Sequence, residues 1–303
     1  MTFFHYGYAG LRVTSELSLP DWSLFESARP FENPDVIIRT GPANPPLGLP
    51  GVSAKEYVFR IPDVGTYSVR DGSEITVVAE TEAGEREVRL FLLGTAWGVL
   101  CYQRGLLVLH AGVVQWEDGA IAFCGPAGSG KSSAGAWLVG RGWRLIGDDL
   151  CRFETTDGGA VAYPSAPRVK LWREALEAMS WPVDGLERDH FRLEKYQFPV
   201  PVPHGPHGFE PVFVRAIYLL DWGELSLTRL TGSDALRRFV AAATYRPELI
   251  ECMGLQATHW ERCLDLARRT TVWRFTRPRD WAAVDGAMDS LLVHVRHIMG
   301  DAA

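Results

Sequence analysis

The sequence predicts a mixed α/β protein with a smaller β-rich domain at its N-terminus. Residues 1–82 hold short extended stretches separated by Pro and Gly clusters, whereas residues 83–303 alternate between strand-like and helix-like segments. Within the second part, an Asp-Gly step joins the apolar segments 106–115 and 120–124 as an antiparallel hairpin. We therefore expect a mixed sheet and a domain boundary between residues 82 and 83.

The expected elements follow from hydrophobic periodicity and turn residues. A helical repeat of apolar residues over 83–103 predicts a buried helix that opens the second domain. Strands are expected within 4–15, 36–40, 56–61 and 66–79, and then at 143–147, 212–220, 225–230 and 271–275. Helices are expected at 131–141, 172–179, 233–243, 258–268 and 279–299, with a second hairpin around 157–159.

The composition excludes several classes of partner. The net charge is −6 and basic residues are spread evenly, so nucleic acid is not expected as a partner. The longest apolar run, residues 91–102, is too short to span a bilayer, and the start resembles no export signal, so no membrane is expected. The five cysteines show no close pairing, which indicates reduced thiols and a cytoplasmic protein.

The strongest motif is a phosphate loop at residues 125–132, placed between an apolar strand and a helix. Its glycines allow backbone N–H groups to converge on phosphate oxygens, and the following helix adds its positive end. Lys131 would reach the terminal phosphates, while the Ser132 hydroxyl would hold Mg²⁺. The alternative is a glycine-rich turn with an incidental lysine. The residues expected to bind the nucleotide are Gly125, Ala127, Gly128, Ser129, Gly130, Lys131, Ser132 and Ser133.

Asp148 and Asp149 form the second constellation. A helix of about eleven residues rises roughly 16 Å, and a returning strand of about five residues covers roughly the same length. The carboxylates should therefore stand beside the loop. Because neighbouring strand residues face opposite sides, one aspartate can serve Mg²⁺ and the other can accept the proton of an attacking hydroxyl. The alternative is that both are turn or capping carboxylates.

The order and spacing of three segments, 109–114, 125–133 and 140–149, resemble the core of HPr kinase/phosphorylase, which shares its core with phosphoenolpyruvate carboxykinase. The resemblance covers residues of about 105 to 175. It implies an HPr kinase-like core within 83–303 that uses Mg²⁺ and ATP or another phosphoryl donor. At the matched positions it implies catalytic roles for His110, Lys131 and Asp148, with Asp148 as base, and a metal site of Ser132 and Asp149. His110 by itself is equally compatible with a buried core histidine.

The chain also departs from that family, because the Gly- and Glu-rich signature downstream of the aspartates is absent. The resemblance therefore does not carry over HPr docking or the reverse phosphorylase activity. Residues 166–172 and the β-rich first domain look more like the homologues that phosphorylate the C-terminal serine of lasso-peptide precursors. We expect a serine-hydroxyl kinase of such a peptide. The alternatives are a kinase of a free small molecule such as serine, or a non-catalytic nucleotide-binding regulatory module. A homo-oligomer is compatible with the resemblance.

Weaker candidates lie further along the chain. Arg168, Lys170 and Lys195 are candidates for binding phosphate or substrate, although a solvated basic face explains them as well. His204 and His207 lie in a Pro- and His-rich stretch, where a mobile lid or plain loop is favoured over a metal site because no nearby Cys or carboxylate completes a ligand set.

Overall fold

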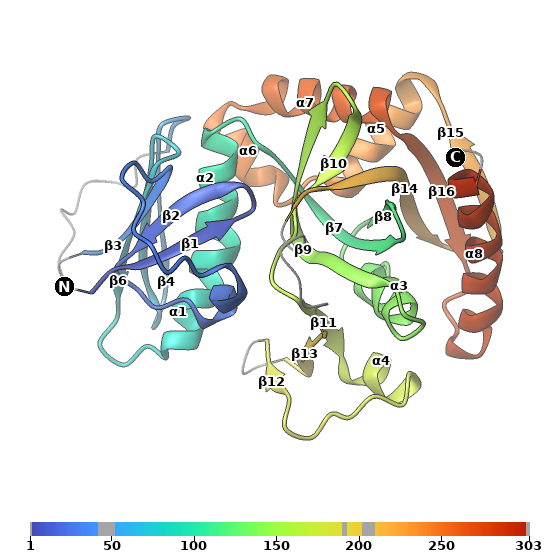
Figure 1. Ribbon diagram of the computed structural model, residues 1–303, viewed down its shortest axis with the longest axis horizontal. Coiled ribbons are helices and arrows are strands. Elements are labelled where there is room, and N and C mark those ends of the chain that lie inside the picture. Colours follow the sequence, from blue (N-terminus) through green and yellow to red (C-terminus); the bar gives the residue numbers. More distant parts are fainter. Residues whose placement is uncertain (1, 42–51, 190–192, 202–209, 301–303) are drawn as a thin grey trace. The chain divides into compact units, whose positions relative to one another are not determined.

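The computed structural model describes residues 2–41, 52–189, 193–201 and 210–300 (Figure 1). Its contacts divide the chain into two compact units. The N-terminal unit comprises Met1–Val108 and Tyr245–Glu261, and the C-terminal unit comprises Leu109–Thr244 and Arg262–Ala303. The mixed α/β class and the β-rich N-terminal region agree with the sequence prediction.

The N-terminal unit is built on a six-stranded sheet with the order β1-β2-β3-β6-β5-β4. Two expected strands, 4–15 and 66–79, are each a hairpin, because left-handed turns at Ala9-Gly10 and Asp71-Gly72 reverse the chain. The strands are β1 (Phe4–Tyr8), β2 (Leu11–Ser15), β3 (Val36–Thr40), β4 (Glu56–Ile61), β5 (Gly65–Arg70) and β6 (Glu74–Ala79). The helices are α1 (Glu85–Phe91), a π-helical turn (Leu92–Ala96), α2 (Trp97–Gln103) and α6 (Pro247–Met253), with a 3-10 turn at Pro20–Phe25.

This division differs from the expected boundary after residue 82. The helical segment 83–103 belongs to the N-terminal unit because its side chains pack there. The Trp97 ring lies 4.9 Å from that of Trp22, which stacks on Tyr8 at 4.0 Å. The Tyr67 hydroxyl also donates to the carbonyl of Val88 at 3.0 Å. Burial of these large aromatic rings makes the helices part of the N-terminal core.

The C-terminal unit is built on a seven-stranded mixed sheet with the order β10-β9-β7-β8-β14-β16-β15. The predicted β7–β8 hairpin is antiparallel, while β14 runs parallel to both β8 and β16. The carboxyl ends of these three parallel strands therefore meet at one edge, where β8 leads into the glycine-rich loop. The strands are β7 (Leu107–Trp116), β8 (Gly119–Cys124), β9 (Arg144–Thr156), β10 (Gly159–Ala162), β14 (Val212–Trp222), β15 (Ser226–Leu230) and β16 (Thr271–Arg277).

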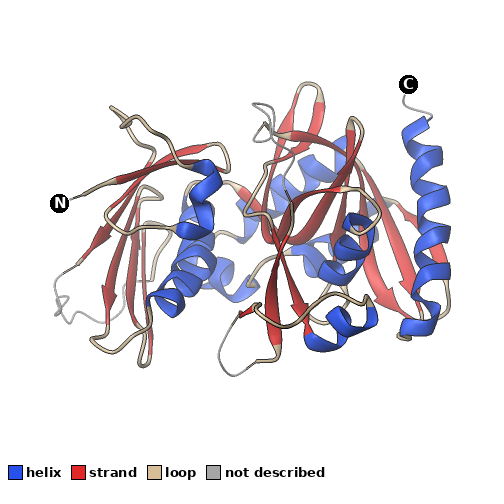
Figure 2. Ribbon diagram, turned by 60° about the horizontal axis from the view of Figure 1, so that its bottom comes forward, coloured by secondary structure: helices blue, strands red, loops and turns tan. Residues whose placement is uncertain are grey.

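Helices cover this sheet, and a small three-stranded sheet, β11-β13-β12, adjoins β9. Figure 2 shows α8, the last helix, running alongside strands of the large sheet. The small sheet consists of β11 (Arg168–Trp172), β12 (Glu187–Arg188) and β13 (Lys195–Pro199). The helices are α3 (Lys131–Val139), α4 (Arg173–Ala178), α5 (Gly232–Ala243), α8 (Val284–Gly300) and the part of α7 (Gln256–Arg269) that follows Glu261, with a 3-10 turn at Trp281–Ala283.

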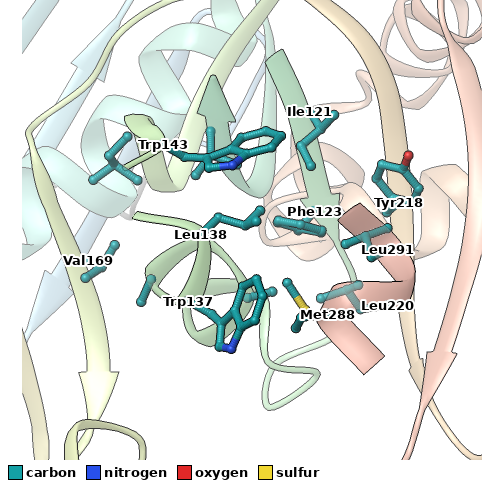
Figure 3. Packing of buried hydrophobic residues seen from close by; sticks show 14 of the residues in the cluster. Ile121, Phe123, Trp137, Leu138, Trp143, Val169, Tyr218, Leu220, Met288 and Leu291 are labelled. Carbon is teal, nitrogen blue, oxygen red and sulfur yellow. The ribbon is translucent and has the colours of Figure 1, made fainter. Parts of the chain in front are cut away.

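One apolar core fixes α3 beneath the glycine-rich loop. Figure 3 shows Trp137 and Leu138 of α3 gathered with Phe123 of β8 and with Met288 and Leu291 of α8. Burying side chains of this size contributes about 1.5–3 kcal/mol each. The helix that starts at the loop is thus held by packing on both its strand and the C-terminal helix.

The structure also bears on the membrane and thiol expectations. None of the helices in the described ranges is long and apolar enough to cross a membrane. All five cysteines carry free thiols.

Candidate active site

The glycine-rich loop has the predicted strand–loop–helix setting, between the end of β8 at Cys124 and the start of α3 at Lys131. Two of its glycines are required by space as well as by backbone. Gly125 has a φ of 155°, and a Cβ there would lie 2.5 Å from the Ser129 hydroxyl oxygen. Gly130 has a φ of 83°, and a Cβ there would collide with the guanidinium of Arg277. The loop therefore follows a path that side chains at these positions would block.

Protein donors occupy the loop's carbonyl oxygens. The Lys131 ammonium donates to the carbonyls of Gly125 at 2.7 Å and Pro126 at 3.1 Å. Arg277 Nη2 donates to the Ser129 carbonyl at 2.9 Å, and the Trp222 indole donates to that of Gly128 at 3.3 Å. Because these carbonyls already accept hydrogen bonds from the protein, an anion would be bound by the first N–H groups of α3.

The predicted loop residues lie where a polyphosphate could meet them. Ala127 and Gly128 are exposed at the tip, whereas Ser132 and Ser133 are half-buried in the first turn of α3. Lys131 is buried, and burial lowers the pKa of its ammonium. Because Lys131 now binds its own loop, an arriving phosphate would have to replace two carbonyl contacts.

Asp148 lies beside the loop, as the helix-and-strand geometry predicted. Its Oδ1 accepts a hydrogen bond from the Ser132 hydroxyl at 2.9 Å, and its Oδ2 accepts one from the Lys170 backbone N–H at 2.9 Å. Burial raises the pKa of Asp148 above its ordinary value despite these donors. Desolvation of this half-buried carboxylate thus favours its protonated form.

Asp149 lies on the same side of the strand as Asp148, which the expected alternation did not predict. Asp149 has a left-handed φ of 79°, so the strand is not extended at this residue. Its carboxylate approaches His110, while Asp148 Oδ1 lies 3.5 Å from the position of a Cβ on Gly112. Since His110 and Gly112 share one face of β7, both carboxylates face the same space.

A half-buried lysine, Lys170, holds Asp149. Lys170 Nζ lies 2.9 Å from Asp149 Oδ2 and 3.2 Å from Asp189 Oδ1. Burial opposes ionisation of both partners, yet Lys170 keeps the pKa of Asp149 below its usual range, and the two carboxylates raise the pKa of Lys170. The pair is therefore ionised at neutral pH.

His110 completes this group. Its Nε2 lies 3.5 Å from Asp149 Oδ1. Burial and the nearby Lys131 lower the pKa of His110 to about 4, although Asp149 acts in the opposite direction. At neutral pH the imidazole is neutral and contributes a hydrogen-bonding group rather than a charge.

The remaining predicted residues lie on β11 and β13. Arg168 is two residues before Lys170 on β11, and Lys195 stands opposite Trp172 in the β11–β13 pairing. His204 and His207 lie outside the described residues. Within the described ranges, no cluster of three or more His, Cys, Asp or Glu side chains could hold a metal ion by itself.

Three residues with clear contacts were missed by the sequence reasoning: Asp189, Trp222 and Arg277. Asp189 had no motif to mark it. Trp222 and Arg277 are the last residues of β14 and β16, and a signal was available because ligands of open α/β sheets gather at the carboxyl ends of parallel strands. Using it required the strand order, which the sequence did not reveal.

Comparisons with known proteins add little to this geometry. No protein-family model matches the sequence, and no curated protein is similar to it. The solved structure of the Hpr(Ser) kinase/phosphatase from Coxiella burnetii can be superposed on 64% of this chain and 99% of its own, with 11% sequence identity and a TM-score of 0.35. A likeness of this size carries no information about substrate.

Proposed function

We propose that this protein transfers the terminal phosphoryl group of a nucleoside triphosphate to a hydroxyl group. The observation that carries the proposal is the convergence of two carboxylates beside one glycine-rich loop. Asp148 is hydrogen-bonded to Ser132 of the loop, and Asp149 is held by Lys170 next to His110. Binding a nucleotide alone does not require a second, separately held carboxylate.

The donor set at Ser132 and Asp148 suits Mg²⁺, which prefers oxygen ligands and takes few of them from the protein. The hydroxyl and carboxylate oxygens are 2.9 Å apart, and a cation bound between them would favour the ionised form of Asp148, whose pKa burial raises. When bound, Mg²⁺ would neutralise charge on the β- and γ-phosphate oxygens.

The assignment of the two aspartates stays open to test. The sequence-based prediction makes Asp148 the base and Asp149 the metal ligand. The contacts favour the reverse order, because Asp148 is the carboxylate bonded to Ser132. Asp149 is the ionised carboxylate next to His110, where an acceptor hydroxyl could be oriented.

In the proposed reaction the acceptor oxygen forms a bond to the γ-phosphorus, and its proton passes to the Asp149 carboxylate. The bond from that phosphorus to the β–γ bridging oxygen breaks, and its electron pair stays on the nucleoside diphosphate. His110 is neutral and can hydrogen-bond either Asp149 or the acceptor. The residues thus mainly position the reactants and stabilise charge, which is how phosphoryl transfer is chiefly catalysed.

For the donor and the acceptor we propose ATP and a serine hydroxyl. Support for the acceptor comes from the sequence resemblance at residues 166–172 and in the β-rich first domain, which points to the C-terminal serine of a lasso-peptide precursor. A free small molecule such as serine is the second acceptor to test.

The decisive experiment incubates the protein with ATP and Mg²⁺ and either a peptide ending in serine or free serine, and detects phosphate addition by mass spectrometry. Asp149→Asn should lower kcat by about 10²-fold or more, and Asp148→Asn should raise the Mg²⁺ concentration needed for half-maximal rate. Asp118→Asn, the same change on an exposed turn, is the control. If nucleotide binds but no hydroxyl substrate gains phosphate, the protein is a nucleotide-binding regulatory module instead.

A further inference from the structure

The chain uses lysine very sparingly, and the few lysines gather at the site. Of its 31 basic side chains, four are lysines and the others are arginines. Three of the four, Lys131, Lys170 and Lys195, belong to the loop and to the small sheet beside it, while Lys55 is exposed in the N-terminal unit. Lysine offers a compact ammonium where arginine offers a wide planar fork, so the two are not interchangeable at a crowded site.

The register of the small sheet places Lys195 on the face that meets the carboxylates. Strands β11 and β13 are antiparallel, with Lys170 opposite Gln197 and Trp172 opposite Lys195. The alternate residues Leu171 and Tyr196 are buried in the core. Because side chains alternate between faces, Lys170 and Lys195 project from the opposite face, and Lys170 reaches Asp149 from there.

The three site lysines differ in what binds them. Lys131 is held by loop carbonyls, and Lys170 is held between Asp149 and Asp189. In the described part of the chain, the half-buried Lys195 ammonium has neither a hydrogen bond nor an ion pair. Its charge nevertheless reaches the site: after burial and nearer charges, Lys195 also lowers the pKa values of Lys131 and His110.

We propose that the Lys195 ammonium contacts the phosphoryl group during its transfer. This inference rests on the proposed function. Lys195 projects from the same face of the small sheet as Lys170, and Lys170 reaches Asp149, the carboxylate beside which the acceptor would lie. As the bond to the bridging oxygen breaks and the bond to the acceptor oxygen forms, Lys195 donates hydrogen bonds to the transferred oxygens and keeps its own protons. A cation placed there stabilises the transition state more than it stabilises bound ATP.

Chemical labelling tests the contact without requiring turnover. The full chain is acetylated with an N-hydroxysuccinimide ester and each lysine is quantified by mass spectrometry. Lys195 should react in the free protein and be protected at least fivefold by Mg²⁺ with a non-hydrolysable ATP analogue, but not by Mg²⁺ with ADP. Lys170 should react poorly throughout, and Lys55 should react equally in every sample. Equal protection by ADP and the analogue, or no protection by either, would overturn the inference.

Variants test the same contact through rate. Lys195→Met should lower kcat by about 10²-fold, with the KM for ATP and the Kd for ADP changed less than about threefold. Lys195→Arg should recover less than a tenth of the rate, and Lys55→Met should match the parent protein. A Lys195→Met rate within threefold of the parent refutes the role. If the parent protein phosphorylates nothing, the proposed function fails, while analogue-specific protection of Lys195 still decides whether it meets the terminal phosphate.

Discussion

Arg277→Met should weaken nucleotide binding, although Arg277 is expected to bind the glycine-rich loop and not the nucleotide itself. Arg277 is 3% exposed, and its Nη2 donates to the Ser129 carbonyl at 2.9 Å and, more weakly, to that of Gly130 at 3.4 Å. Its guanidinium also lies 4.4 Å from the centre of the Trp222 ring. Burial lowers the pKa of Arg277 to about 10, so it remains charged at neutral pH. Methionine keeps much of the stem and removes every donor.

The size of the effect follows from the stronger hydrogen bond. A hydrogen bond from a charged donor contributes about 1.5–3 kcal/mol, and its loss leaves the Ser129 carbonyl without that partner. If a loss of about 2–3 kcal/mol appears as the cost of ordering the loop, the Kd rises about 30- to 150-fold. The affinities for ATP and for ADP should fall by the same factor, because the loop is expected to bind the phosphates that both nucleotides share. This separates Arg277 from Lys195, whose removal should spare ADP.

Isothermal titration of Mg²⁺-ATP and Mg²⁺-ADP measures this effect. Arg274→Met is the matched control on the same strand: Arg274 is half-exposed and pairs at 2.8 Å with Asp221, also on the surface. A surface pair of this kind contributes about 0–1 kcal/mol, and its loss should leave nucleotide affinity within about twofold. Circular dichroism and thermal unfolding establish that each variant is folded. A folded Arg277→Met protein that binds ATP within threefold of the parent would refute the reasoning.

Two further predictions concern stability. Gly130→Ala should lose nucleotide binding and cost clearly more free energy of unfolding than Gly128→Ala, because Gly130 has a φ of 83° and a Cβ there would also strike Arg277. Gly128→Ala, at a φ of 79° but with no atom within 4 Å, should cost only about 1–2 kcal/mol, and equal losses would contradict this account. His259 is 7% exposed and burial lowers its pKa to about 4 from 6.5, so stability should fall as pH drops from 6.5 to 4, by up to about 3 kcal/mol from this residue. His259→Phe should flatten the pH dependence of the unfolding free energy by that amount, and an unchanged slope would exclude the effect.

Local patterns predicted the loop and its surroundings well. The β7–β8 hairpin follows from an Asp-Gly step between apolar runs, and the path from Lys131 to Asp148 follows from helix and strand lengths alone. These features depend on neighbours in sequence. The same periodicity predicted most strands and helices of the C-terminal unit, but β12 and β13 of the small sheet were not expected.

Non-local contacts explain what the sequence did not reveal. Trp222 and Arg277 meet the loop only because β14 pairs with β8 and β16 pairs with β14, and hydrophobic periodicity does not reveal this strand order. The shared face of Asp148 and Asp149 depends on one left-handed residue, which a rule of alternation overlooks. The roles assigned to these aspartates, to Arg168 and to Lys195 stay predictions.

The path of the chain between the two units limits how this protein can be divided. The chain enters the C-terminal unit at Leu109, leaves it at Tyr245 and returns at Arg262, so α6 belongs to the N-terminal unit although it is encoded between β14 and β16. A truncated chain starting at Leu109 would keep the buried apolar residues of α6, including Leu249 and Ile250, but would lose most of the unit to which α6 belongs. We therefore expect that residues 1–108 cannot be exchanged for another domain on their own. Recombination at a single junction would leave α6 in the chain without the rest of its unit.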